Sequence, residues 1–157
     1  MMMLDSIEDK ELRLFVDSVR NYFKKTTMKD ADITSAFLGT GDVDGHEFNG
    51  VVTFSGSYNG QIIVSMPKQL LRELLVMQKE VDLTDDNLLD IVGEIANTLA
   101  GNARKKLDGG DGLEISVPVK FQGNANSTRA RVRQHPYIIT LSWMKCPALV
   151  CIDISKT

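Results

Sequence analysis

The residues best suited to chemistry lie in one short segment, between positions 90 and 101. An α-helix turns about 100° per residue, so relative to Asp90 the side chains of Glu94 and Asn97 fall at about 40° and −20°, and Gly101 at about 20°. One narrow stripe would therefore carry two acids, an amide and a bare stretch of backbone. The apolar residues of the segment fall on the opposite side and are predicted to face a core: Leu88, Val92, Ile95 and Leu99.

Two residue types in this segment are unusual inside a helix. Glycine is about 1 kcal/mol less favourable than alanine there, and the segment contains both Gly93 and Gly101. Asparagine is also a poor helix former, because its side chain competes for backbone hydrogen bonds. A helix that keeps these residues on or beside its exposed stripe gives up stability, which favours the interpretation that the stripe is open to a partner.

An acid and an amide on such a stripe suit a particular kind of chemistry. The carboxamide of Asn97 donates and accepts hydrogen bonds without carrying a charge, so it can hold a water molecule at a fixed angle. Phosphoryl transfer depends largely on such positioning. Glu94 could abstract a proton or pair with a lysine of a partner. Because the sequence supplies no cluster that would bind a substrate phosphate unaided, the pair makes most sense when it is inserted into the active site of another protein.

The rest of the chain predicts the elements that position this stripe. Thr84 is a suitable N-cap for the key helix, which should run to about Leu107, with Asp85 and Asp86 favouring its N-terminal dipole. Apolar periodicity predicts two further helices, over Ile7–Lys25 and Pro67–Gln78. Strands are expected at Ile33–Leu38, Phe48–Ser55, Gln61–Met66, Leu113–Phe121, Arg129–Arg133, Tyr137–Met144 and Leu149–Ile154. This order predicts an α+β fold, with helices packed on a largely antiparallel sheet.

The motif Asp90-x-x-x-Glu94-x-x-Asn97, with the following Thr-Leu-Ala-Gly101 and with Val117-Pro118, resembles the signature of the CheC/CheX/FliY family of chemotaxis phosphatases. The predicted hairpin that begins at Phe48 and the Met66-Pro67 pair are similar to the sheet region of the same family. The chain carries the motif helix once rather than twice, so the CheX branch is the closer one. The resemblance covers nearly the whole chain and implies one CheX-like domain over residues 1–157.

This resemblance implies an activity and a partner. Members of the family hydrolyse the phospho-aspartate of the response regulator CheY. Glu94 would pair with a lysine of the regulator, and Asn97 would enter its active site and orient the attacking water, while Asp90 and Gly101 would contribute to partner binding. The protein would need no cofactor of its own, because the Mg²⁺ belongs to the regulator. The family also implies a cytoplasmic homodimer whose sheets join across the interface.

Two other functional classes remain open at this point. One is a non-catalytic module that binds the regulator or builds a flagellar-switch-like assembly, since the same fold is related to switch components. The other is a stand-alone hydrolase of small molecules that uses Asp90 and Glu94 as an acid/base pair, although no nucleophile or oxyanion pocket is visible.

Composition excludes several classes of protein. The 157 residues are 43% hydrophobic and 25% charged, as in an ordinary globular domain, and the net charge of −3 argues against nucleic-acid binding. No apolar run could cross a bilayer, and we expect no signal peptide. Cys146 and Cys151 are five residues apart, so on one strand they would point to opposite faces and remain free thiols.

Other polar groups carry weaker signals. His46 and His135 lack ligand spacing, and Asp42-x-Asp44-Gly45-His46-Glu47 lacks the register of an EF-hand, so no metal site is expected. The alternating Arg129, Arg131 and Arg133 would share one strand face. Such a face either discourages edge pairing or forms a docking patch for an acidic regulator.

Overall fold

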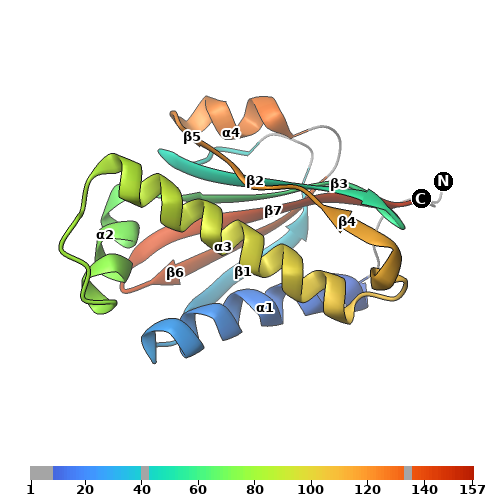
Figure 1. Ribbon diagram of the computed structural model, residues 1–157, viewed down its shortest axis with the longest axis horizontal. Helices are drawn as coiled ribbons and strands as arrows, with labels where there is room; N and C mark the ends of the chain where they lie inside the picture. The colour runs from blue at the N-terminus through green and yellow to red at the C-terminus, as the bar shows by residue number, and fades with distance from the viewer. Residues whose placement is uncertain (1–8, 40–42, 133–135) are drawn as a thin grey trace.

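The computed structural model describes residues 9–39, 43–132 and 136–157 (Figure 1). None of the helices in these ranges is long and apolar enough to cross a membrane. The predicted elements are present with ends within about three residues of expectation, apart from two segments in the last third. In chain order the elements are α1 (Asp9–Thr27), β1 (Asp32–Leu38), β2 (Phe48–Gly56), β3 (Tyr58–Met66), α2 (Lys68–Met77), α3 (Asp85–Lys106), a 3-10 turn (Gly110–Gly112), β4 (Leu113–Ile115), β5 (Val119–Gln122), α4 (Ala125–Arg131), β6 (Tyr137–Trp143) and β7 (Cys146–Lys156).

The strands form one seven-stranded sheet in the order β1-β6-β7-β3-β2-β4, and β5 also pairs with β2. Every pairing between these strands is antiparallel. Helices α1 and α3 lie on one side of the sheet, whereas the short α4 lies on the other (Figure 1). The predicted α+β architecture is therefore confirmed.

The two faces of the sheet bury cores of different size. The larger cluster joins the sheet to α1, α2 and α3, and the smaller one lies on the opposite face. Strand β7 serves both, because successive side chains of a strand alternate faces: Val150 and Ile152 belong to the larger cluster, and Leu149 to the smaller.

The two cysteines follow this alternation as predicted. Cys146 lies in the larger cluster and Cys151 in the smaller, and both are buried free thiols. Burial raises the pKa of Cys151 to about 12, helped by the charge of Asp153, so its thiol is protonated at neutral pH.

The prediction of one strand over Leu113–Phe121 is wrong, because the segment divides into β4 and β5. Both pair with β2, but between the pairs Phe54–Ile115 and Val51–Val119 two residues of β2 face three residues of the other segment. The extra residue forms an irregularity next to Pro118, which has no backbone N–H to donate. The break gives β5 its own path beside α3 (Figure 1).

The prediction of a strand over Arg129–Arg133 is also wrong, because residues 125–131 form α4. Asn124 and Ser127 make a reciprocal capping box that starts this helix. Its only buried side chain is Thr128, whose hydroxyl donates a 2.8 Å hydrogen bond to Oδ1 of the buried Asn49 in β2. Arg129 and Arg131 therefore lie on a helix and do not share a strand face, and Arg133 lies outside the described residues.

Candidate functional site

Helix α3 is the rigid element that carries the predicted site. The hydroxyl of Thr84 accepts a hydrogen bond from the backbone N–H of Asn87, and the helix then runs for 22 residues. Acidic residues occupy its first turn and basic residues its last, which suits the helix dipole. The four apolar residues predicted to face the core are at most 2% exposed: Leu88, Val92, Ile95 and Leu99.

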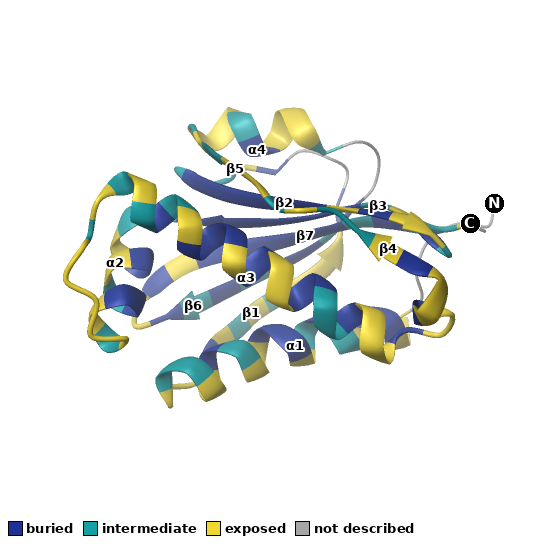
Figure 2. Cartoon of the chain, viewed as in Figure 1, coloured by how far each residue is buried: buried dark blue, intermediate teal, exposed yellow. Residues whose placement is uncertain are grey.

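The opposite side of α3 presents the predicted stripe to solvent (Figure 2). Asp90, Glu94 and Asn97 are all exposed, and Gly101 is half-buried. Apart from its own helix backbone and chain neighbours, no heavy atom of the described residues lies within 4 Å of the place where a side chain would begin at Gly101. A partner could approach the helix backbone closely here.

Glu94 and Asn97 keep their polar groups available. In the described part of the chain neither side chain forms a hydrogen bond or ion pair, whereas the neighbouring Thr98 hydroxyl donates to the carbonyl of Glu94 at 2.9 Å. Glu94 also faces α1. Burial raises the pKa of Tyr22 to about 12, and the charge of Glu94 adds to this effect while a hydrogen bond with Thr26 opposes it.

Asp90 differs from the other two polar residues because it already has a partner. The ammonium of Lys120 on β5 lies 2.6 Å from Oδ1 of Asp90. The sequence alone does not predict this ion pair, since it depends on the irregularity that brings β5 alongside α3.

Gly93 is buried, so the expectation that it helps to keep the stripe accessible is wrong. A side chain there would begin 2.7 Å from the methylenes of Lys120 and 3.5 Å from Pro118. On the sheet side, a side chain at Gly50 of β2 would begin 2.5 Å from the carbonyl oxygen of Val92. Both glycines therefore serve close packing of α3 against β2 and β5, which fixes the height of the helix above the sheet.

The weaker candidates from the sequence are engaged in structural contacts. Asp44 pairs with Arg129, and Glu47 accepts a hydrogen bond from Gln122 at 2.5 Å. The guanidinium of Arg131 stacks over the ring of Phe121 at 5.2 Å. Burial lowers the pKa of His46, which favours the neutral imidazole. Asp42 and His135 lie outside the described residues, and within the described ranges no three potential ligands gather to hold a metal ion.

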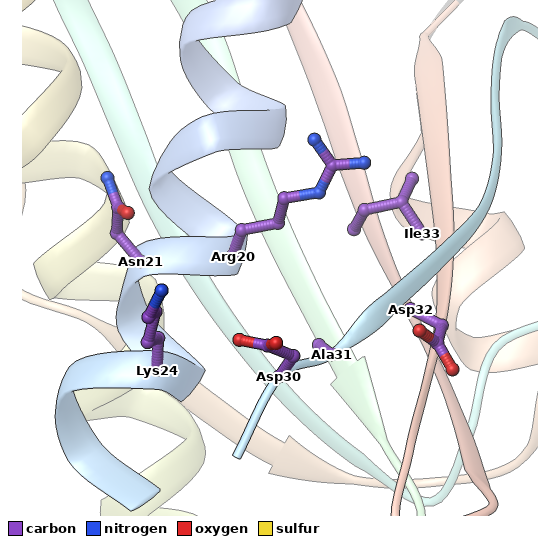
Figure 3. Close-up of a pocket in the computed structure, with 7 residues that line it drawn as sticks. All are labelled: Arg20, Asn21, Lys24, Asp30, Ala31, Asp32 and Ile33. Atoms are coloured by element: carbon purple, nitrogen blue, oxygen red, sulfur yellow. The ribbon is translucent and has the colours of Figure 1, made fainter. Parts of the chain in front are cut away.

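A surface cavity of about 460 Å³ lies away from the stripe, between the C-terminal half of α1 and the start of β1 (Figure 3). Its polar lining contains two cations, Arg20 and Lys24, and two acids, Asp30 and Asp32. Opposite charges are therefore mixed along its wall. It contains none of the residues predicted for the site.

The arrangement of helices on an antiparallel sheet is similar to that of solved chemotaxis proteins. The chain aligns with the chemotaxis protein CheX from Vibrio vulnificus with a TM-score of 0.77 and 19% identity, over 92% of this chain and 99% of that one. A CheC-like protein from Shewanella sp. PV-4 aligns with a TM-score of 0.77 and 20% identity, over 95% of this chain and 98% of that one. CheX in the CheX–CheY–BeF3–Mg²⁺ complex from Borrelia burgdorferi aligns with a TM-score of 0.75 and 20% identity, over 92% of this chain and 97% of that one.

The family follows from a second comparison. A family model described as chemotaxis phosphatase CheX matches residues 48–142, and the chain belongs to this family. The match includes α3 with its stripe, and strands β2 and β5, which pack against this helix. No curated protein matches the chain.

Proposed function

We propose that this protein accelerates hydrolysis of the phospho-aspartate of a CheY-type response regulator. The observation that carries the proposal is the exposure of Glu94 and Asn97, side by side on a rigid helix and without hydrogen-bond partners in the described part of the chain. Membership of the CheX family supports it. So does the Borrelia burgdorferi complex, in which CheX is bound to CheY with BeF3 and Mg²⁺.

The two side chains have different roles in this proposal. Glu94 pairs with a lysine of the regulator and fixes the position of α3 against its active site. Asn97 lies three residues further on, a rise of about 4.5 Å, and accepts a hydrogen bond from the attacking water. The water oxygen bonds to phosphorus as the bond to the aspartate oxygen breaks, releasing inorganic phosphate and a carboxylate. The Mg²⁺ is held by the regulator and neutralises the charge of the phosphoryl group.

The remaining residues of the stripe border the contact with the regulator. The open space at Gly101 allows a loop of the partner to approach the helix backbone. We propose this role for Gly101 as a partner-binding residue. Asp90 lies at the other end of the stripe. Because its carboxylate is paired with Lys120, it can contribute to partner binding only together with that lysine.

Replacing Glu94 with alanine is expected to weaken both binding and turnover. A hydrogen bond to a charged group contributes about 1.5–3 kcal/mol, so the Kd for the regulator should rise about 10- to 150-fold. The measurement is a titration of regulator carrying BeF3 and Mg²⁺, followed by phosphate release from the phosphorylated regulator. Glu80→Ala removes an exposed acid away from the stripe and should change neither value. Unaltered binding by Glu94→Ala would exclude the clamp.

The alternative function is a binding module that does not hydrolyse anything. The same assay separates the two functions, because a module of this kind would bind the phosphorylated regulator while phosphate is lost only at the regulator's own rate. The proposed function requires acceleration by less than one equivalent of this protein.

We also propose that the protein forms a homodimer through β1. This strand ends the sheet and pairs with β6 on one side, and its residues Phe37 and Leu38 are 49% and 40% exposed. An exposed edge strand offers unpaired backbone groups to a second copy. Sedimentation equilibrium should give about twice the 17.4 kDa chain mass, and Phe37→Lys should give the mass of one chain. A wild-type protein that stays monomeric at high concentration would exclude this dimer.

A further inference from the structure

The ion pair between Lys120 and Asp90 lies directly beside the proposed site. Asp90 precedes Glu94 by four residues, so both carboxylates occupy the same side of α3. The side chain of Asp90 is 65% exposed and that of Lys120 is 38% exposed. The ammonium of Lys120 reaches Asp90 because its methylenes lie over the bare backbone of Gly93. The packing of β5 on α3 thus holds this cation at one end of the stripe.

Asp90 and Glu94 are both able to pair with a lysine of the regulator. The regulator could therefore bind at two different positions along α3. A lysine held by Glu94 has Asn97 three residues away. A lysine held by Asp90 would have Asn97 seven residues away, so the amide would miss the phosphoryl group by a helical rise of about 6 Å. A complex of the second kind would bind the regulator but would not hydrolyse it.

We propose that Lys120 is a positioning residue that prevents this non-productive register. By pairing with Asp90 it neutralises the competing carboxylate and places a positive charge where the regulator's lysine would otherwise go. Glu94 then remains the one acid of the Asp90, Glu94 and Asn97 group that is free to hold that lysine. This inference rests on the proposed function, since it assigns a positioning role to a contact at the same site.

The substitution that tests the inference is Lys120→Met, which retains methylenes over Gly93 and removes the charge. Non-productive binding lowers kcat and KM by the same factor and leaves kcat/KM unchanged. Because exposed ion pairs are weak, we expect both constants to fall about two- to fivefold. In the double variant Lys120→Met, Asp90→Asn the competing carboxylate is absent, and both constants should return to the wild-type values. Lys10→Met disrupts another exposed lysine–aspartate pair, with Asp108, and serves as the matched control.

A binding measurement tests the register without relying on hydrolysis. With regulator carrying BeF3 and Mg²⁺, Glu94→Ala should weaken binding clearly in the wild-type background. It should weaken binding less in the Lys120→Met background, where Asp90 can replace Glu94 as the anchor. Equal effects of Glu94→Ala in the two backgrounds, or a fall in kcat/KM that Asp90→Asn does not restore, would overturn the role of Lys120 and leave the proposed function standing. A wild-type protein that neither binds the regulator nor accelerates phosphate loss would overturn both.

Discussion

Asn97→Ala is expected to lower the rate of phosphate release from the regulator about 100-fold, which is the scale on which misplacing a reacting group by about 1 Å slows a reaction. Alanine cannot accept a hydrogen bond from the attacking water, so the water loses its orientation. Binding should remain within about twofold of wild type, because Glu94 and the surrounding surface are intact. The measurement combines single-turnover phosphate release with a titration of regulator carrying BeF3 and Mg²⁺.

The control for this variant is Asn102→Ala, which removes the same side chain from a different face of α3, about 140° away. It should retain wild-type activity. Stability should be unaffected by Asn97→Ala, because the side chain is exposed and has no partner within the described residues. Full activity in Asn97→Ala would exclude the water-orienting role, whatever the variant does to binding.

The second large effect is expected at Glu11, whose carboxylate is buried although most acids are exposed. Glu11 is 3% exposed, and its Oε2 accepts a 2.5 Å hydrogen bond from the hydroxyl of Tyr58. Its Oε1 lies 3.4 Å from the ammonium of Lys156. These contacts join the start of α1 to β3 and to the end of β7. Glu11→Ala removes the carboxylate that accepts the hydrogen bond of the buried Tyr58 hydroxyl, so it should lower the free energy of unfolding by about 1–3 kcal/mol.

Urea denaturation of three variants measures this effect. Glu11→Ala should shift the midpoint strongly, and Tyr58→Phe should shift it less, since Lys156 still compensates the carboxylate. Asp17→Ala removes an exposed acid from the same helix and should change the free energy of unfolding by less than about 0.5 kcal/mol. A loss below about 1 kcal/mol in Glu11→Ala would contradict the assignment of a buried polar link.

The sequence predicts α3 well because several signals agree there. Its apolar period, its Thr84 cap and its charged ends all indicate one long amphipathic helix, so the exposure of Glu94 and Asn97 could be predicted from spacing alone. Strands β2, β3, β6 and β7 are equally predictable from the sequence, since they are rich in β-branched residues and are bounded by turns.

The two wrong strand predictions fall in segments that are short or that lack a repeating apolar pattern. Helix α4 has only seven residues and buries only Thr128, so no apolar period exists to reveal it, and the alternating arginines imitate a strand. The capping pair Asn124 and Ser127 was the available signal. Residues 113–121 have a strand-like composition throughout, so the composition does not predict the break between β4 and β5 next to Pro118.

The contact of Lys120 with Asp90 could not be predicted from the sequence, because it joins residues 30 apart through the path of β5. The same holds for Gly93. Its spacing places it beside the stripe, but only the packing of Lys120 and Pro118 against α3 explains why no side chain fits there. Long-range pairing of strands thus determines the surroundings of the site, whereas local periodicity determines its central residues.

The proposed phosphatase activity is tested by the decay of a phosphorylated CheY-type regulator in the presence of a small fraction of one equivalent of this protein. We expect the whole regulator pool to lose phosphate faster than it does alone, at a rate proportional to the amount of protein added and dependent on Asn97. A regulator that binds the protein yet loses phosphate only at its intrinsic rate would contradict the claim, and would instead identify the exposed stripe of α3 as a surface for binding alone.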